Sequence, residues 1–85
     1  MMKVLLLADN WVGWKVTQYL QSIGEDIVGL FVHTPEYQHY ADEIIEASKL
    51  DSKKIFIGKK EWSEKQIKKV KELNPEIILV VLWTF

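Results

Sequence analysis

The 85-residue chain contains no cysteine, which excludes disulfides, thiol nucleophiles and cysteine-based metal sites. The absence of cysteine fits a reducing compartment, and we expect a cytoplasmic protein. The chain also has no excess of either charge, since 11 Lys and Arg face 12 Asp and Glu. A formal charge of −1 gives no long-range attraction to a phosphate backbone, so we expect no direct nucleic-acid binding by this segment.

No apolar run is long enough to cross a bilayer, which takes about 20 residues. Residues 4–8 and 77–83 are the longest such runs. The first is too short for the core of a signal peptide and is followed by the polar pair Asp9 and Asn10. We therefore expect no membrane association and interpret both runs as buried strands.

Four short apolar runs alternate with three helical patterns along the chain. Continuous apolar stretches are typical of strands buried on both faces, and apolar residues three or four apart are typical of helices. Gly24, Asp51 and Pro75 stand where helices should stop, Thr34 could cap a helix with Pro35 in its first turn, and Ser63 with Gln66 matches a capping box. We predict strands at 2–8, 26–33, 54–57 and 76–83, and helices at 13–22, at 37–50 and after Ser63.

This β-α-β-α-β-α-β order predicts an α/β fold, half of a doubly wound parallel sheet. Right-handed crossovers give the strand order 3-2-1-4, as in a Rossmann-like domain. Ligands of such sheets bind at the carboxyl ends of the strands, where the strand order reverses. Residues 9–13 and 83–85 should border that crevice.

The crevice lacks the dinucleotide fingerprint, which would need glycine at positions 8, 10 and 13. Only Gly13 is present, and His33 stands where an acid would hold the ribose. NAD binding is therefore disfavoured. Gly13 could open a helix that faces an anion, or could simply allow a tight strand-to-helix turn.

Other polar residues near the strand ends have a structural and a functional interpretation. Asp9 occupies the position of phosphoacceptor or metal-binding acids, but it or Asn10 could instead order its own turn through an Asx-type bond. His33 could contact a ligand. With His39 it makes only a weak metal site, because no paired acid is in register.

The four tryptophans divide between packing and ligand contact. Trp14 and Trp62 are expected to pack or anchor helices, whereas Trp11 and Trp83 could stack on a flat ligand or pack against another part of the protein. No nucleophile and base can be paired from these residues, so we assign no catalytic residue and no metal ligand.

The chain resembles, along its whole length, the N-terminal subdomain of formyltransferases that use 10-formyltetrahydrofolate, such as methionyl-tRNA formyltransferase and the sugar-nucleotide N-formyltransferases. The residues that carry this resemblance are 3–8 with Gly13, 27–35, and the approach to the last strand at 73–81. It implies a truncated N-terminal α/β subdomain over residues 1–85.

In that family an Asn, a His and an Asp assist attack of an amine on the formyl carbon. The resemblance places all three beyond Phe85, so it implies that this segment alone is inactive. The acceptor would be an amine, on a nucleotide sugar or another small molecule in preference to methionyl-tRNA, and both alternatives stay open. The residues that carry over as cofactor-binding are Asp9, Asn10, Trp11, Gly13, Trp83 and Phe85.

The alternative is a stand-alone small α/β binding or protein-interaction module. In either case residues 76–83 form an apolar strand at an edge of the sheet, and such an edge invites pairing with another chain. We therefore expect self-association through this edge.

Overall fold

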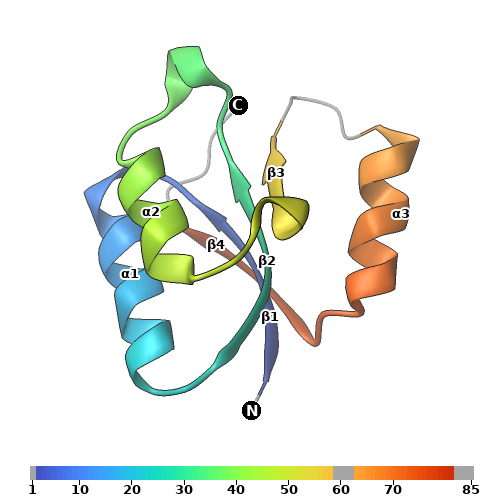
Figure 1. Cartoon of the computed structure of the whole chain (residues 1–85), viewed down its shortest axis with the longest axis horizontal. Coiled ribbons are helices and arrows are strands. Elements are labelled where there is room, and N and C mark those ends of the chain that lie inside the picture. The colour runs from blue at the N-terminus through green and yellow to red at the C-terminus, as the bar shows by residue number, and fades with distance from the viewer. Residues whose placement is uncertain (1, 59–62, 82–85) are drawn as a thin grey trace.

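The computed structural model describes residues 2–58 and 63–81, and strands alternate with helices along them. The strands form one parallel sheet in the order β3-β2-β1-β4 (Figure 1). The predicted α/β half-sheet and its strand order are confirmed. The elements are β1 (Lys3–Ala8), α1 (Asn10–Ser22), β2 (Asp26–Val32), the 3-10 turn η1 (Pro35–Tyr37), α2 (Ala41–Ser48), the 3-10 turn η2 (Ser52–Lys54), β3 (Ile55–Ile57), α3 (Glu64–Leu73) and β4 (Ile77–Val81).

The first strand, β1, lies inside the sheet and is paired on both sides. Leu5 is opposite Gly29 of β2 and Ile78 of β4, and Leu7 is opposite Val80 of β4. This double pairing buries every residue of β1 after Lys3, which is why its sequence is continuously apolar rather than alternating.

Helices cover the sheet unequally. Helices α1 and α2 lie on one face and α3 lies alone on the other (Figure 1). The core under α1 and α2 is the larger one, with buried residues Leu6, Ala8, Ile27, Leu30, Val32, Ala41 and Ile44. Among the described residues, the core under α3 has Leu5, Leu7 and Phe31 as its buried members, and α3 itself contributes no buried residue. Helix α3 is therefore the more weakly held of the two layers.

Two glycines set how closely the helices approach the sheet. A Cβ at Gly13 would lie 3.2 Å from Ala8 Cβ and 3.3 Å from Ala8 C, so α1 packs directly onto the end of β1. A Cβ at Gly29 would lie 2.8 Å from Leu73 Cδ1 and 2.9 Å from Leu5 Cδ1. Each glycine thus leaves room that a helix or a core side chain fills.

The second crossover differs from the sequence prediction. The expected helix at 37–50 is replaced by η1, a break at residues 38–40, and the shorter helix α2. Thr34 precedes the 3-10 turn η1 rather than an α-helix, and its side chain makes no capping hydrogen bond. Tyr40 has a left-handed backbone with φ of 64°. Because an α-helix cannot continue through this conformation, the chain does not form one continuous helix over residues 37–50.

Both ends of α3 follow the predicted signals, but the start of α1 does not. The capping box is confirmed, since the Ser63 hydroxyl accepts from Gln66 N and the Gln66 side chain accepts from Ser63 N. Asn74 ends α3 in a left-handed conformation, directly before Pro75. Helix α1 begins at Asn10, three residues before the predicted start. Residues 82 and 83 of the predicted fourth strand lie outside the described residues.

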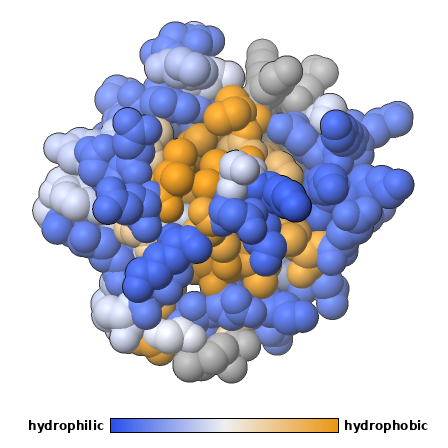
Figure 2. Space-filling model, in the orientation of Figure 1, coloured by the Kyte–Doolittle hydropathy of each residue, from blue (hydrophilic) through white to orange (hydrophobic). Residues whose placement is uncertain are grey.

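The two edges of the sheet differ. Edge strand β3 has three residues, and the Gln66 amide donates to the Ile57 carbonyl at 2.9 Å, which occupies part of its edge. Around it, apolar surface lies between the α1–α2 pair and α3 (Figure 2). At the opposite edge β4 is longer and wholly apolar, and Ile78 and Val80 are 50% and 55% exposed.

Candidate functional site

The carboxyl edge of the sheet brings the polar residues that follow β1 and β2 close to the end of β4. Asp9 follows β1, and its N–H donates to the carbonyl of Val81, the last residue of β4, at 3.2 Å. His33 follows β2 and is buried. The ends of β1, β2 and β4 therefore meet where the sequence predicts a ligand crevice.

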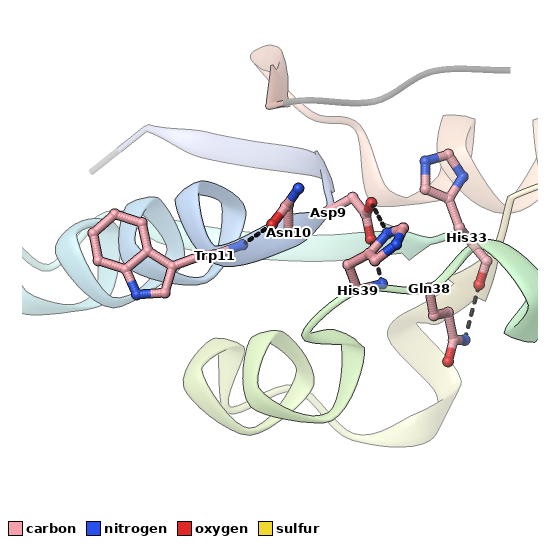
Figure 3. A network of polar contacts seen from close by, with 6 residues as sticks. All are labelled: Asp9, Asn10, Trp11, His33, Gln38 and His39. Carbon is pink, nitrogen blue, oxygen red and sulfur yellow. Dashed lines mark hydrogen bonds and ion pairs between the residues drawn. The ribbon is translucent and has the colours of Figure 1, made fainter.

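Asp9 and His39 form the most highly connected polar contact at this edge (Figure 3). The Asp9 carboxylate accepts from the His39 N–H at 2.9 Å through Oδ1, and its Oδ2 lies 3.2 Å from His39 Nδ1. The His39 carbonyl in turn accepts from the Asn10 N–H at 2.8 Å. Three contacts thus fix His39 against the junction of β1 and α1, although 30 residues separate it from Asp9 along the chain.

The two side chains of this pair differ in burial. The Asp9 side chain is 10% exposed, and the His39 side chain is 63% exposed. A carboxylate that is mostly withdrawn from water needs hydrogen-bond donors, and the backbone N–H of His39 supplies one of them. Within residues 2–58 and 63–81 no partner is found for Nε2, the other nitrogen of this largely exposed ring.

Two residues with left-handed backbones flank the pair. Asn10 has a φ of 68° and Tyr40 a φ of 64°. Asn tolerates this region, whereas a Tyr there is strained by about 1–2 kcal/mol. The Tyr40 ring stacks on Trp14, with ring centroids 5.7 Å apart, which helps hold that conformation. Backbone strain of this kind is commonly found where a structure positions functional side chains.

The predicted ligand-binding loop places its residues in three different environments, those of Asn10, Trp11 and Gly13. Asn10 Oδ1 accepts from Trp11 N at 2.7 Å, which leaves its amide Nδ2 without a partner among the described residues. Trp11 is 50% exposed, and its indole points away from the Asp9–His39 pair (Figure 3). Gly13 is buried against Ala8 and serves close helix–strand packing. The predicted residues Trp83 and Phe85, and Trp62, lie outside the described residues.

One sequence expectation at this edge is wrong, and a second holds for Asn10 but not for Asp9. The histidines were expected to have no acid in register, yet His39 is paired with Asp9. The Asp9 carboxylate does not order its own turn, because both of its oxygens face His39. Asn10 does make a local bond, to the next residue. The expected packing role of Trp14 is confirmed by its contacts with the larger core and with Tyr40.

His33 does not join the Asp9–His39 pair in a metal site. Its carbonyl accepts from the Gln38 amide at 2.8 Å, which holds the chain between β2 and the His39 segment (Figure 3). Among the described residues, no three His, Asp or Glu side chains are grouped so as to hold a metal ion.

An open groove of about 500 Å³ runs between the outer faces of α1 and α2. None of the predicted site residues that the structure describes lines it, and Gln21 bridges the two helices there by donating to the Ser48 carbonyl at 2.6 Å. The groove is lined by Trp14, Gln18, Gln21, Ser22, Glu43, Glu46, Ala47 and Lys49.

Comparison of the chain with protein-family models, curated proteins and solved structures finds no match. A search of the described helices finds none with the length and hydropathy that crossing a bilayer requires.

Proposed function

We propose that this chain supplies one wall of a small-molecule site at the carboxyl edge of its sheet, between β1 and β4. The observation that carries this proposal is the sheet order β3-β2-β1-β4, which reverses beside Asp9. Asn10 Nδ2 and His39 Nε2 offer a hydrogen-bond donor and a titratable nitrogen there. Both suit a ligand that carries hydroxyl, amine or carbonyl groups.

We further propose that the complete site serves formyl transfer from 10-formyltetrahydrofolate to an amine. The support for this reaction is the residue-level resemblance in β1, β2 and the approach to β4, together with a sheet order that such a domain requires. On this proposal residues 1–85 bind and orient the ligand, and the transfer itself depends on the Asn, His and Asp that the resemblance places beyond Phe85.

The described residues fit only part of a reduced folate. Asn10 Nδ2 and His39 Nε2 suit its polar atoms. Its ring system would need an aromatic or apolar surface, and Trp11 points away from the pair (Figure 3). Lys15 Nζ also lies over the Trp11 ring, 5.7 Å from its centroid.

Binding of a stable reduced folate, 5-formyltetrahydrofolate, tests the proposal by isothermal titration calorimetry. Asn10→Gly removes the amide yet still permits the left-handed backbone, and loss of one hydrogen bond should weaken binding about 3- to 10-fold. Gln18→Ala, on an exposed part of α1, is the matched control and should bind like the parent chain. No saturable binding, or equal weakening by both variants, would overturn the folate proposal.

A second candidate function is association with a second copy of the chain through β4. The specific observation is that Ile78 and Val80 lie beside Leu5 and Leu7 on the α3 face of the sheet but are half exposed. Within residues 2–58 and 63–81 no strand pairs with the outer edge of β4, and β4 carries no charged residue that would oppose pairing with itself. Two copies could thus extend the sheet through identical apolar strands.

Sedimentation velocity over a range of concentrations tests this second function. We expect the weight-average sedimentation coefficient to rise with concentration toward that of a dimer. A monomer at every concentration would remove self-association as a function of the chain and would leave the ligand-site proposal unchanged.

A further inference from the structure

The orientation of His39 carries an inference about proton transfer. An ionised carboxylate can only accept hydrogen bonds, so a neutral His39 that contacts Asp9 Oδ2 through Nδ1 must carry its proton on Nδ1. The lone pair of the ring is then on Nε2, on the exposed side. Carboxylates orient imidazoles in this way in metal sites and in general-base sites.

We propose that His39 Nε2 is the proton acceptor of the ligand site, with Asp9 as its positioning residue. This inference rests on the proposed binding of a small molecule at the carboxyl edge. The proton of a ligand amine or hydroxyl moves to Nε2, whose lone pair forms the new N–H bond. The electron pair of the broken bond stays on the ligand nitrogen or oxygen, and the Asp9 carboxylate stabilises the imidazolium that results.

The contacts between Asp9 and His39 include one more than is needed to hold β1 and the His39 segment together. The backbone contacts, from His39 N to Asp9 Oδ1 and from Asn10 N to His39 O, already join the two segments. The third contact, to Nδ1, fixes the ring instead. The left-handed Tyr40 that follows, stacked on Trp14, holds the segment that presents this ring.

Such an acceptor suits a reaction in which a ligand amine attacks a carbonyl carbon, because the amine then becomes a cationic ammonium and must lose a proton. The same acceptor would serve any ligand whose hydroxyl or amine is deprotonated as it reacts. The substrate class is therefore a small molecule with a nucleophilic amine or hydroxyl group.

The substitution Asp9→Asn separates the two roles of Asp9. Its Oδ1 must still accept from the His39 N–H, so the amide NH₂ takes the place of Oδ2 and becomes a donor toward Nδ1. The ring must then accept at Nδ1 and carry its proton on Nε2. The backbone tie survives, while the exposed lone pair is lost.

Nitrogen-15 NMR of the imidazole reads the tautomer directly, without any ligand. We expect neutral His39 to be protonated on Nδ1 in the parent chain and on Nε2 in Asp9→Asn. Reactivity with diethyl pyrocarbonate, which modifies an unprotonated imidazole nitrogen, should fall at His39 in Asp9→Asn, because the remaining lone pair is then on Nδ1 and accepts from the side-chain amide at position 9. N-acetylhistidine in the same tube serves as the reference.

A parent His39 protonated on Nε2, or equal reactivity of the two chains, would overturn the proton-acceptor role. The parent tautomer decides the matter alone if Asp9→Asn does not fold. Failure of folate binding with the expected tautomers would overturn the folate proposal and leave the acceptor in place, so the two failures are distinguishable.

Discussion

Asp9 joins three segments of the chain through its own atoms. Its N–H donates to β4, its carbonyl accepts from Gly13 N in α1 at 3.1 Å, and its carboxylate accepts from His39. A single residue at the end of β1 therefore fixes the candidate site to the sheet, to a helix and to the second crossover. Its side chain contributes to stability as well as to the proposed chemistry.

We expect Asp9→Ala to lower the free energy of unfolding by about 1–3 kcal/mol, because the partly buried His39 N–H loses its acceptor. Asp9→Asn keeps that acceptor and should cost less than about 1 kcal/mol. Urea denaturation followed by circular dichroism measures both. Asp26→Ala, at the exposed start of β2, is the control, and equal stability of Asp9→Ala and Asp26→Ala would contradict the expectation.

Gly13 acts at the same scale through close packing. In Gly13→Ala the new Cβ would meet Ala8 at 3.2–3.3 Å, and one of the atoms it meets is backbone carbon, which cannot rotate away. Overpacking costs about 1–3 kcal/mol, while alanine gains up to about 1 kcal/mol of helix propensity. We expect a net loss of roughly 1 kcal/mol in thermal or urea unfolding. Val12→Ala, on the exposed side of α1, should not destabilise, so a stabilised Gly13→Ala would refute the packing argument.

At the scale of elements, the stability of α3 depends on the hydrogen bonds at its two ends and on one apolar stripe. Its contribution to the core comes from the partly buried Val70 and Leu73, and Gly29 leaves the space that Leu73 approaches. The capping box at Ser63 and the left-handed Asn74 close its two ends. With so little buried area, local interactions form a large share of what keeps this helix in place.

Ser63→Ala should therefore destabilise α3 more than the rest of the chain. Loss of the cap costs about 1 kcal/mol, and amide hydrogen exchange in α3 should quicken more than in β1 or α1. Ser52→Ala changes an exposed serine at the start of η2 and should leave exchange in α3 unaltered. Uniform quickening over the whole chain would show instead that α3 unfolds only together with the sheet.

The strands and helices could be predicted from the sequence more reliably than the side-chain contacts between them. Apolar runs identify strands such as β1 because burial on both faces removes polar residues, and the Ser63 cap is a local pattern. The break before α2 was missed, since Tyr40 gives no local sign of a left-handed backbone. The Asp9–His39 contact depends on the crossover that brings residues 30 apart together, which no short pattern encodes. A hint was available: an acid directly after a buried strand needs a partner.

For the whole molecule, the difference between the two edges of the sheet determines where a second copy can associate. Edge strand β3 is short and Gln66 occupies part of its edge, while β4 exposes a longer apolar strand. Natural sheets usually protect such an edge with charge, a bulge or a covering element. In the described part of the chain β4 has none of these on its outer side, so association should concentrate there.

Val80→Lys should abolish concentration-dependent association, because a charge on the exposed face of β4 opposes pairing with a second copy. Light scattering at increasing concentration checks this, with circular dichroism to confirm the fold. Tyr19→Lys replaces an exposed aromatic residue on α1 and should leave association intact. If both lysine variants dissociate the protein equally, the interaction is a general effect of charge and not of β4.

The position of β1 has a consequence for biosynthesis. β1 leaves the ribosome first, yet one of its two neighbours, β4, begins only at Ile77. At roughly 5–20 residues per second, β1, β2 and β3 emerge some seconds before β4 does. Throughout that interval the nascent sheet presents Leu5 and Leu7 along an unpaired inner strand. The speed of translation through α3 therefore sets how long this leucine-rich edge is open to chaperones or to a neighbouring nascent chain.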